Sequence, residues 1–261
     1  MTTPSRVLYD VSDRVARLTL NRPEKLNVLD RATMQEIDRA VARAGEDPEV
    51  GVLIVTGTGD KAFAAGADVQ ELASQDPVEG AAFSRAGQAV LGRLERLGKP
   101  SIAAINGYAL GGGLELAMAC TIRVASETAR LGLPETTLAI IPGYGGTQRL
   151  SRLVGRGRAL EMVLTGEAID AREAHRIGLV GRVVPAAELR PTVESLARTL
   201  LSRGPVALRY ALQAVQEGAE MTQEEGQLLE SSLFGLTCAT EDMREGTRSF
   251  LEKRKPTYRG R

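Results

Sequence analysis

The chain has 261 residues, of which 43% are hydrophobic and 25% charged, and its 33 basic residues balance its 33 acidic ones. This is the composition of a globular protein of one large domain or a domain with an appendage, and zero net charge gives no reason to expect nucleic acid or membrane as a partner. No apolar stretch is long enough to span a bilayer, and Cys120 and Cys238 form no motif spacing, which favours a reduced, cytoplasmic protein.

Strands and helices alternate along the first half of the chain. Residues 1–10 lack the basic and then apolar pattern of a signal peptide, so we expect no targeting segment. Apolar runs predict strands over residues 14–20, 50–57, 101–106 and 122–126. Apolar residues at helical spacing predict helices over residues 31–45 and 81–98, and from about Gly112. The alternation predicts an α/β fold with parallel crossovers.

Helical patterns dominate the C-terminal part. Strand signals fade after about residue 147, apart from a short apolar stretch over 178–184, and helices are predicted over residues 186–203, 205–217, 222–238 and 241–252. We therefore expect residues 1–200 to form the core that carries the chemistry and residues 201–261 to form a helical region. This region exposes apolar side chains unless it packs on the core or on another subunit: Leu228, Leu229, Leu233 and Phe234.

A single histidine, His175, limits the chemistry available to the chain. It follows a potential capping box of Asp170 with Glu173, and we interpret it as a residue on the surface of a helix. One histidine and two distant cysteines cannot build the usual zinc sites, and no GxSxG motif accompanies His175. If the chain is an enzyme, its acid and base groups are therefore carboxylates.

Glu115 is a carboxylate in the apolar run 109–120, directly behind three glycines. A carboxylate in such surroundings must be neutralised, paired or used. The alternative is a glutamate at the edge of a buried helix whose carboxylate reaches water. A second candidate, Glu135, follows twenty positions later; taken alone, it fits an ordinary acid at a turn or helix start.

Two glycine-rich loops, 63–68 and 109–113, each follow an apolar strand. Small residues allow a ligand to approach the backbone closely and leave N–H groups free to donate. Each loop alone fits a tight connection between strand and helix, and neither matches the GxGxxG pattern of a dinucleotide-binding fold. Two such loops beside Glu115 form a stronger pattern for a binding site.

Four motifs carry a resemblance to a known family: "LNRPEKLNVLD", "KAFAAGADVQEL", "INGYALGGGLELAMACTIRVAS" and "LGLPETTLAIIPGYGGTQRL". In this order they resemble the crotonase (enoyl-CoA hydratase/isomerase) superfamily, and residues 168–185 and 250–261 extend the match over nearly the whole chain. The resemblance implies a crotonase-like β-β-α spiral core with a C-terminal helical trimerisation region, assembled as homotrimers or homohexamers. It also implies acyl-CoA thioester substrates and no metal or redox cofactor, since coenzyme A is part of the substrate.

The resemblance also implies roles for individual residues. Backbone N–H groups of Ala67 and Gly112 form the oxyanion hole, where two donors stabilise the enolate-like charge of a reacting thioester. Glu115 holds and activates the water, and Glu135 transfers the proton at C2. Positions that match coenzyme A contacts in relatives are Lys25, Leu26, Ala65, Asp68, Phe250 and Lys253.

The leading hypothesis is an enoyl-CoA hydratase that adds water syn across the 2,3-double bond to give 3-hydroxyacyl-CoA. Relatives that only isomerise double bonds generally keep one catalytic acid, so the presence of both glutamates favours hydration. The alternatives are a methylglutaconyl-CoA or branched enoyl-CoA hydratase and an enoyl-CoA isomerase. One branch of the family binds RNA through a lysine-rich helix, but the corresponding residues 31–50 contain no lysine, so we expect no nucleic-acid partner.

Two departures from the family pattern concern the acyl chain. Tyr144 stands where smaller residues are common, and Leu114 stands where many short-chain hydratases have cysteine. We expect residues 72–86 to line the acyl pocket.

Overall fold

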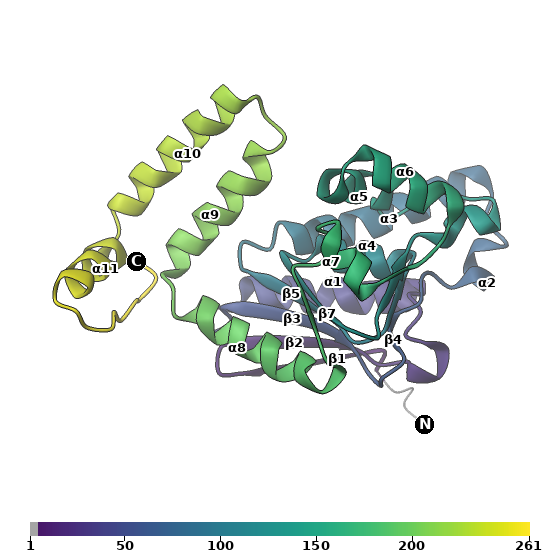
Figure 1. Ribbon diagram of the computed structural model, residues 1–261, viewed down its shortest axis with the longest axis horizontal. Coiled ribbons are helices and arrows are strands. Elements are labelled where there is room, and N and C mark those ends of the chain that lie inside the picture. The colour runs from purple at the N-terminus through teal and green to yellow at the C-terminus, as the bar shows by residue number, and fades with distance from the viewer. Residues whose placement is uncertain (1–4) are drawn as a thin grey trace. The chain divides into compact units, whose positions relative to one another are not determined.

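The computed structural model describes residues 5–261. The chain divides into two compact units, one reaching to Leu97 and continuing over Ser101–Glu194, the other comprising Gly98–Pro100 and Ser195–Arg261 (Figure 1). The division falls within helix α8 (Leu189–Leu201), whereas the sequence predicts a boundary after residue 200. In the part of the chain that the structure describes, no helix is both long and apolar enough to cross a membrane.

The first unit contains a six-stranded sheet. Its strands, in spatial order, are β1 (Val7–Ser12), β2 (Val15–Leu20), β3 (Val52–Gly57), β5 (Ser101–Ile105), β7 (Ile122–Ser126) and β10 (Arg182–Val184). Strand β1 is antiparallel to β2, and all other neighbours are parallel. The central strands β3 and β5 are almost wholly buried, as expected of parallel strands covered on both faces.

A second, four-stranded sheet is built from very short strands. They are β4 (Ala62–Ala64), β6 (Tyr108–Leu110), β8 (Arg130–Gly132) and β9 (Ile169–Asp170), with β9 antiparallel to β8. Strands β3, β5 and β7 of the first sheet are each followed directly by β4, β6 and β8 of the second, and then by helices. This repeated β-β-α order confirms the expected spiral core.

Among the described residues, seven α-helices complete the first unit up to β10: α1 (Arg31–Glu46), α2 (Val69–Leu72), α3 (Pro77–Glu95), α4 (Gly112–Ala119), α5 (Gly146–Val154), α6 (Arg156–Thr165) and α7 (Ala171–Arg176). Helix α3 begins at Pro77, before the predicted start at residue 81, because Asp76 and Glu79 form a reciprocal capping box at its start. Every residue of α4 is buried, so this helix runs through the core rather than along the surface (Figure 1).

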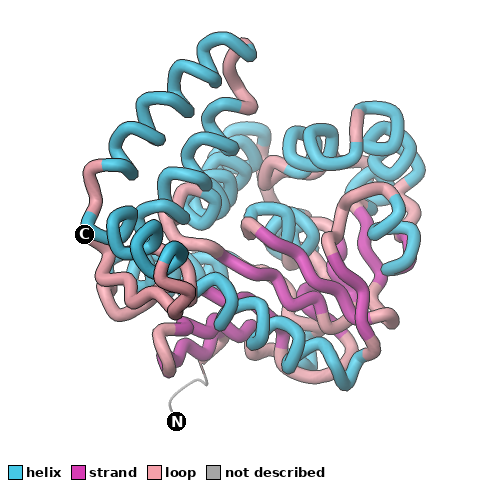
Figure 2. The backbone as a smooth tube through the Cα atoms, turned by 60° about the vertical axis from the view of Figure 1, so that its left-hand side comes forward, coloured by secondary structure: helices cyan, strands magenta, loops and turns pink. Residues whose placement is uncertain are grey.

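The second unit contains the C-terminal helices α9 (Pro205–Gly218), α10 (Gln223–Cys238) and α11 (Glu241–Leu251), which confirms the predicted helical tail. Helices α9 and α10 lie side by side as an antiparallel pair (Figures 1 and 2). On α10, Leu233 is only 7% exposed, whereas Leu228 and Phe234 are each 69% exposed. Part of the predicted apolar stripe is therefore buried within the chain itself, and the rest faces outward.

Candidate active site

Glu115 occupies the first turn of α4 and is 1% exposed. Its Oε1 accepts hydrogen bonds from the backbone N–H of Tyr144 at 2.8 Å and of Gly146 at 2.7 Å. A Cβ on Gly146 would lie 2.8 Å from this oxygen, so only glycine lets the loop approach the carboxylate so closely. Both observed hydrogen bonds use Oε1, which leaves Oε2 for a bound molecule.

The surroundings of Glu115 favour its neutral form. Burial and, to a smaller extent, the charge of Glu135 raise the pKa of this carboxyl group to about 7, against the hydrogen bonds from the amides of Gly146 and Tyr144, which lower it. The carboxylate therefore does not reach water as a surface glutamate does. The alternative of a helix-edge residue whose carboxylate reaches water is therefore wrong, and the functional role of Glu115 stays a prediction.

Glu135 lies in the 3₁₀ helix η2 (Pro134–Leu138), which follows β8. Burial raises its pKa to about 7, opposed by a hydrogen bond from its own backbone N–H. Its Oε2 is buried and has no hydrogen-bond partner among the described residues. A buried carboxylate oxygen without a partner costs free energy, which indicates that this oxygen is kept for a ligand.

The predicted oxyanion donors lie together. Gly112 is the first residue of α4, and a Cβ placed on it would be 3.6 Å from the amide nitrogen of Ala67. Neither N–H group donates a hydrogen bond within residues 5–261. The loops that carry them touch because Gly113 has no side chain: a Cβ there would overlap the carbonyl oxygen of Ala64.

One cavity of about 710 Å³ brings these groups together. Its lining includes Glu115 and Glu135 as well as Ala67 and Gly112. The remaining wall comes from the segment before and within α3, from the loop after η2 and from the start of α5, namely Leu72, Gln75, Gly80, Phe83, Ser84, Gln88, Ala139, Ile140, Ile141, Pro142, Gly143, Tyr144, Gly145, Thr147 and Gln148. Residues 72–86, expected to line the acyl pocket, supply five of these positions.

Of the positions predicted to contact coenzyme A, four lie around one pair of loops. The carbonyl of Leu26 accepts a hydrogen bond from the amide of Ala65 at 3.0 Å, and Lys25 directly precedes Leu26 on an exposed 3₁₀ turn. Asp68 caps α2, where its carboxylate accepts from the amide of Gln70 at 3.0 Å.

The other two predicted contacts belong to the second unit. Phe250 is 83% exposed near the end of α11, and the amide of Lys253 donates to the carbonyl of Phe250 at 3.2 Å. His175 is not part of the cavity: its Nδ1 lies 3.1 Å from the carbonyl oxygen of Val180. Within the described chain, no group of three or more histidine, cysteine or acidic residues is placed to hold a metal ion.

Sequence reasoning missed two features of the site. The first is that the amides of Tyr144 and Gly146 hold Glu115, which the turn "PGYGG" alone does not indicate. The second is Asn27, which is 1% exposed and has a left-handed backbone. Its side chain donates to the carbonyls of Thr58 and Ala62 and so fixes the loop that ends at Ala67. The signal available in the sequence was an asparagine in a loop, since this side chain commonly hydrogen-bonds to backbone groups.

Two buried carboxylates of raised pKa face the same cavity as two backbone donors without a partner among residues 5–261, an arrangement suited to acid–base chemistry beside a carbonyl group. Residues 10–261 match the enoyl-CoA hydratase/isomerase family, and the chain belongs to it.

Relatives over nearly the full length support this membership. The chain is 44% identical to the crotonyl-CoA hydratase of Syntrophomonas wolfei over 97% of both chains, and 45% identical to the short-chain-enoyl-CoA hydratase of Clostridium acetobutylicum over 96% of both. The crystal structure of an enoyl-CoA hydratase from Bacillus anthracis superposes with a TM-score of 0.95 at 41% identity, covering 98% of this chain and all of that one.

Proposed function

We propose that the chain is an enoyl-CoA hydratase, which adds water syn across the 2,3-double bond of a 2-enoyl-CoA thioester and forms the 3-hydroxyacyl-CoA. The observation that carries the proposal is that Glu115 and Glu135 face one cavity with raised pKa values. An enzyme that only moves a double bond needs one such acid. The relatives named for hydration of crotonyl-CoA and of short-chain enoyl-CoA support the same reaction.

The amides of Ala67 and Gly112 bind the thioester oxygen. Negative charge develops on this oxygen when water attacks C3, and two preorganised donors stabilise it more than they stabilise the substrate. The N-terminus of α4 adds the positive end of the helix dipole at Gly112.

The two glutamates exchange protons with one water molecule. Ionised Glu115 takes a proton from the water as its oxygen forms the bond to C3, and protonated Glu135 gives its proton to C2. The pair therefore holds one proton before and after the reaction. The charge of Glu135, which raises the pKa of Glu115, and the pKa of about 7 for each carboxyl group support this. Hydration transfers no electrons, so the proposal includes no redox cofactor. It includes no metal ion because the amides of Ala67 and Gly112 stabilise the charge on the thioester oxygen.

Coenzyme A lies along the paired loops of Leu26 and Ala65 in this proposal. The exposed Lys25 supplies a mobile positive charge for a phosphate, and Asp68 ends the same loop. We also propose that Phe250 and Lys253 complete the coenzyme A site of a neighbouring subunit in a homotrimer or homohexamer. The two free cysteines, Cys120 and Cys238, support a reduced compartment, which we propose is the cytoplasm.

The test follows the loss of the conjugated enoyl absorbance with crotonyl-CoA, combined with analysis of the product. Formation of 3-hydroxybutyryl-CoA supports the proposal. A shifted double bond without a hydroxylated product would identify an isomerase instead. A panel of straight and branched thioesters, methylglutaconyl-CoA among them, then ranks the acyl groups, and a filter-binding assay at low salt checks that RNA is not bound.

A further inference from the structure

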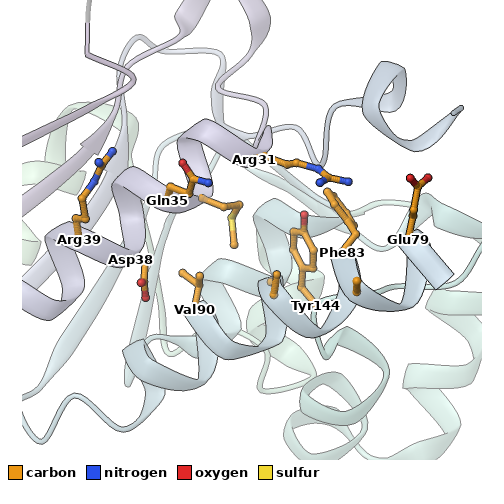
Figure 3. A pocket seen from close by; sticks show the side chains of 12 residues that line it. Arg31, Gln35, Asp38, Arg39, Glu79, Phe83, Val90 and Tyr144 are labelled. Carbon is orange, nitrogen blue, oxygen red and sulfur yellow. The ribbon is translucent and has the colours of Figure 1, made fainter. Parts of the chain in front are cut away.

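A second cavity, of about 630 Å³, lies between α1 and α3 in the first unit (Figure 3). Its inner wall is apolar and comes from Met34, Ala82, Ala86 and Val90. Charged and polar side chains stand around it, as Figure 3 shows for Arg31, Gln35, Asp38, Arg39 and Glu79. No residue with a proposed catalytic role lines this cavity.

The second cavity and the site cavity share a wall made of two aromatic rings. Phe83 and Tyr144 line both cavities, and they are the residues that the two linings have in common. Their ring centroids are 5.3 Å apart and the ring planes are inclined by 37°. The guanidinium group of Arg31 lies 5.7 Å from the centroid of Phe83 on the side of the second cavity (Figure 3). We refer to Phe83 and Tyr144 as the partition.

The position of Tyr144 in the partition is fixed by close contacts. A Cβ on Gly87 of α3 would overlap the Tyr144 ring, and a Cβ on Gly112 would lie 3.3 Å from its other edge. The ring therefore fills the space between two helices at positions that have no side chain. Its backbone is held as well, because the amide donates to Glu115 and the carbonyl accepts from Arg149 at 2.9 Å.

We propose that the partition sets the upper limit of acyl-chain length in this protein, and that the second cavity is the space into which a longer chain extends when Tyr144 is made small. This inference rests on the proposed function. The oxyanion donors and the two glutamates fix the first three carbons of the acyl group, so the remaining carbons extend into the cavity until they meet the rings. Wild-type protein should therefore favour short, unbranched 2-enoyl-CoA thioesters.

The experiment compares kcat/KM for 2-enoyl-CoA thioesters of four to twelve carbons. In Tyr144→Ala, the ratio of ten-carbon to four-carbon kcat/KM should rise by about tenfold or more, since a single methylene in an apolar pocket already changes discrimination by about that much. Tyr144→Phe keeps the ring and should keep the wild-type ratio. Gly87→Leu added to Tyr144→Ala refills the space and should lower the ratio again. If Tyr144→Ala does not fold, Phe83→Ala is the substitute variant: it removes the other ring of the partition and should raise the same ratio.

Binding of saturated acyl-CoA thioesters by calorimetry gives a readout that does not depend on turnover. Tyr144→Ala should bind decanoyl-CoA about tenfold or more tightly than wild type does, with little change for butyryl-CoA. Equal chain-length profiles for folded Tyr144→Ala and wild type, in binding and in turnover, would overturn the partition. A wild type that binds acyl-CoA with the expected length limit but forms no hydroxylated product would contradict only the proposed function.

Discussion

The amide nitrogen of Tyr144 lies 2.8 Å from Oε1 of Glu115, so a residue of the partition also holds a proposed catalytic carboxylate. The contact is made by the backbone, whereas the ring of Tyr144 separates the two cavities. Substitution at this position therefore changes the wall without removing the donor to Glu115. The backbone amide of Tyr144 holds the proposed catalytic carboxylate, whereas its ring forms the proposed limit on acyl-chain length.

Replacing either glutamate by glutamine should lower kcat by about two to four decades, the usual range for a positioned acid or base. In Glu115→Gln, the amide oxygen still accepts from Tyr144 and Gly146, so the loop should stay in place. In the double variant with Glu135→Gln, the fold decrease in kcat should be much smaller than the product of the two single decreases, because the two groups act on one water molecule. Steady-state kinetics with crotonyl-CoA measures all three. Wild-type hydration by Glu115→Gln would mean that this carboxylate is structural.

The rate should depend on pH in a bell shape centred near neutrality. Both carboxyl pKa values are raised to about 7, so the pair holds one proton over a limited range around that pH. At lower pH the base is protonated, and at higher pH the acid has lost its proton. A profile of kcat/KM for crotonyl-CoA measures this, and a flat profile between about pH 5 and pH 9 would contradict paired acid and base roles.

Burial of Glu115 should make the free energy of unfolding fall as the pH rises. Its pKa rises from 4.5 to about 7 on folding, so both states hold the proton at low pH, and above 4.5 the unfolded state ionises first. Glu115→Gln removes this effect, and its stability relative to wild type should increase between about pH 4.5 and pH 7 by up to about 3 kcal/mol. Urea unfolding across that range measures the difference, with Glu188→Gln at an exposed position as the matched surface control.

Gly112→Pro should remove the N–H group that faces the site while the protein stays folded, because proline suits the first position of a helix. Loss of one oxyanion donor typically lowers kcat by about 10²–10³-fold. Gly112→Ala is the matched control: it adds the same Cβ, 3.3 Å from the Tyr144 ring, but keeps the donor. Similar kcat values for the two folded variants would remove this amide from the mechanism.

Removal of residues 222–261 should give an aggregating or monomeric, inactive protein if the tail assembles subunits. Phe234→Asp is a milder test, since this exposed side chain leaves the packing of Leu233 within the chain intact. Light scattering should show a trimer or hexamer for the intact chain and smaller species for the variant. A monomer of the intact chain would contradict the assembly.

The long elements could be predicted from the sequence because their apolar periodicity extends over many residues. Helix α1 and strand β3 lie where expected, and α4 begins at Gly112. The second sheet could not be found in the same way, since β4, β6 and β8 have three residues each, too few for a pattern to repeat. Strand β1 has six residues and was missed for a different reason: the apolar Leu8 is exposed, so apolar and polar residues do not alternate clearly along it.

The candidate site was partly visible in the sequence. Glu115 stood out because a carboxylate rarely sits in a wholly apolar run. Its partners could not be inferred, because Tyr144 and Gly146 lie about thirty residues further along the chain and reach it only through the fold of one loop. The second cavity likewise depends on how α1 and α3 pack, which no local pattern determines.

The strand order of the six-stranded sheet matters for biosynthesis. From β1 to β10, spatial order follows the order of translation, so each parallel strand emerges from the ribosome after the neighbour on which it pairs. The nascent sheet can thus grow at one edge without rearrangement. Until Arg182–Val184 has been made, however, that edge is β7, an apolar strand with open backbone groups. Between translation of residue 126 and residue 184, β7 is therefore an edge to which another chain can pair, and protection of that edge limits aggregation.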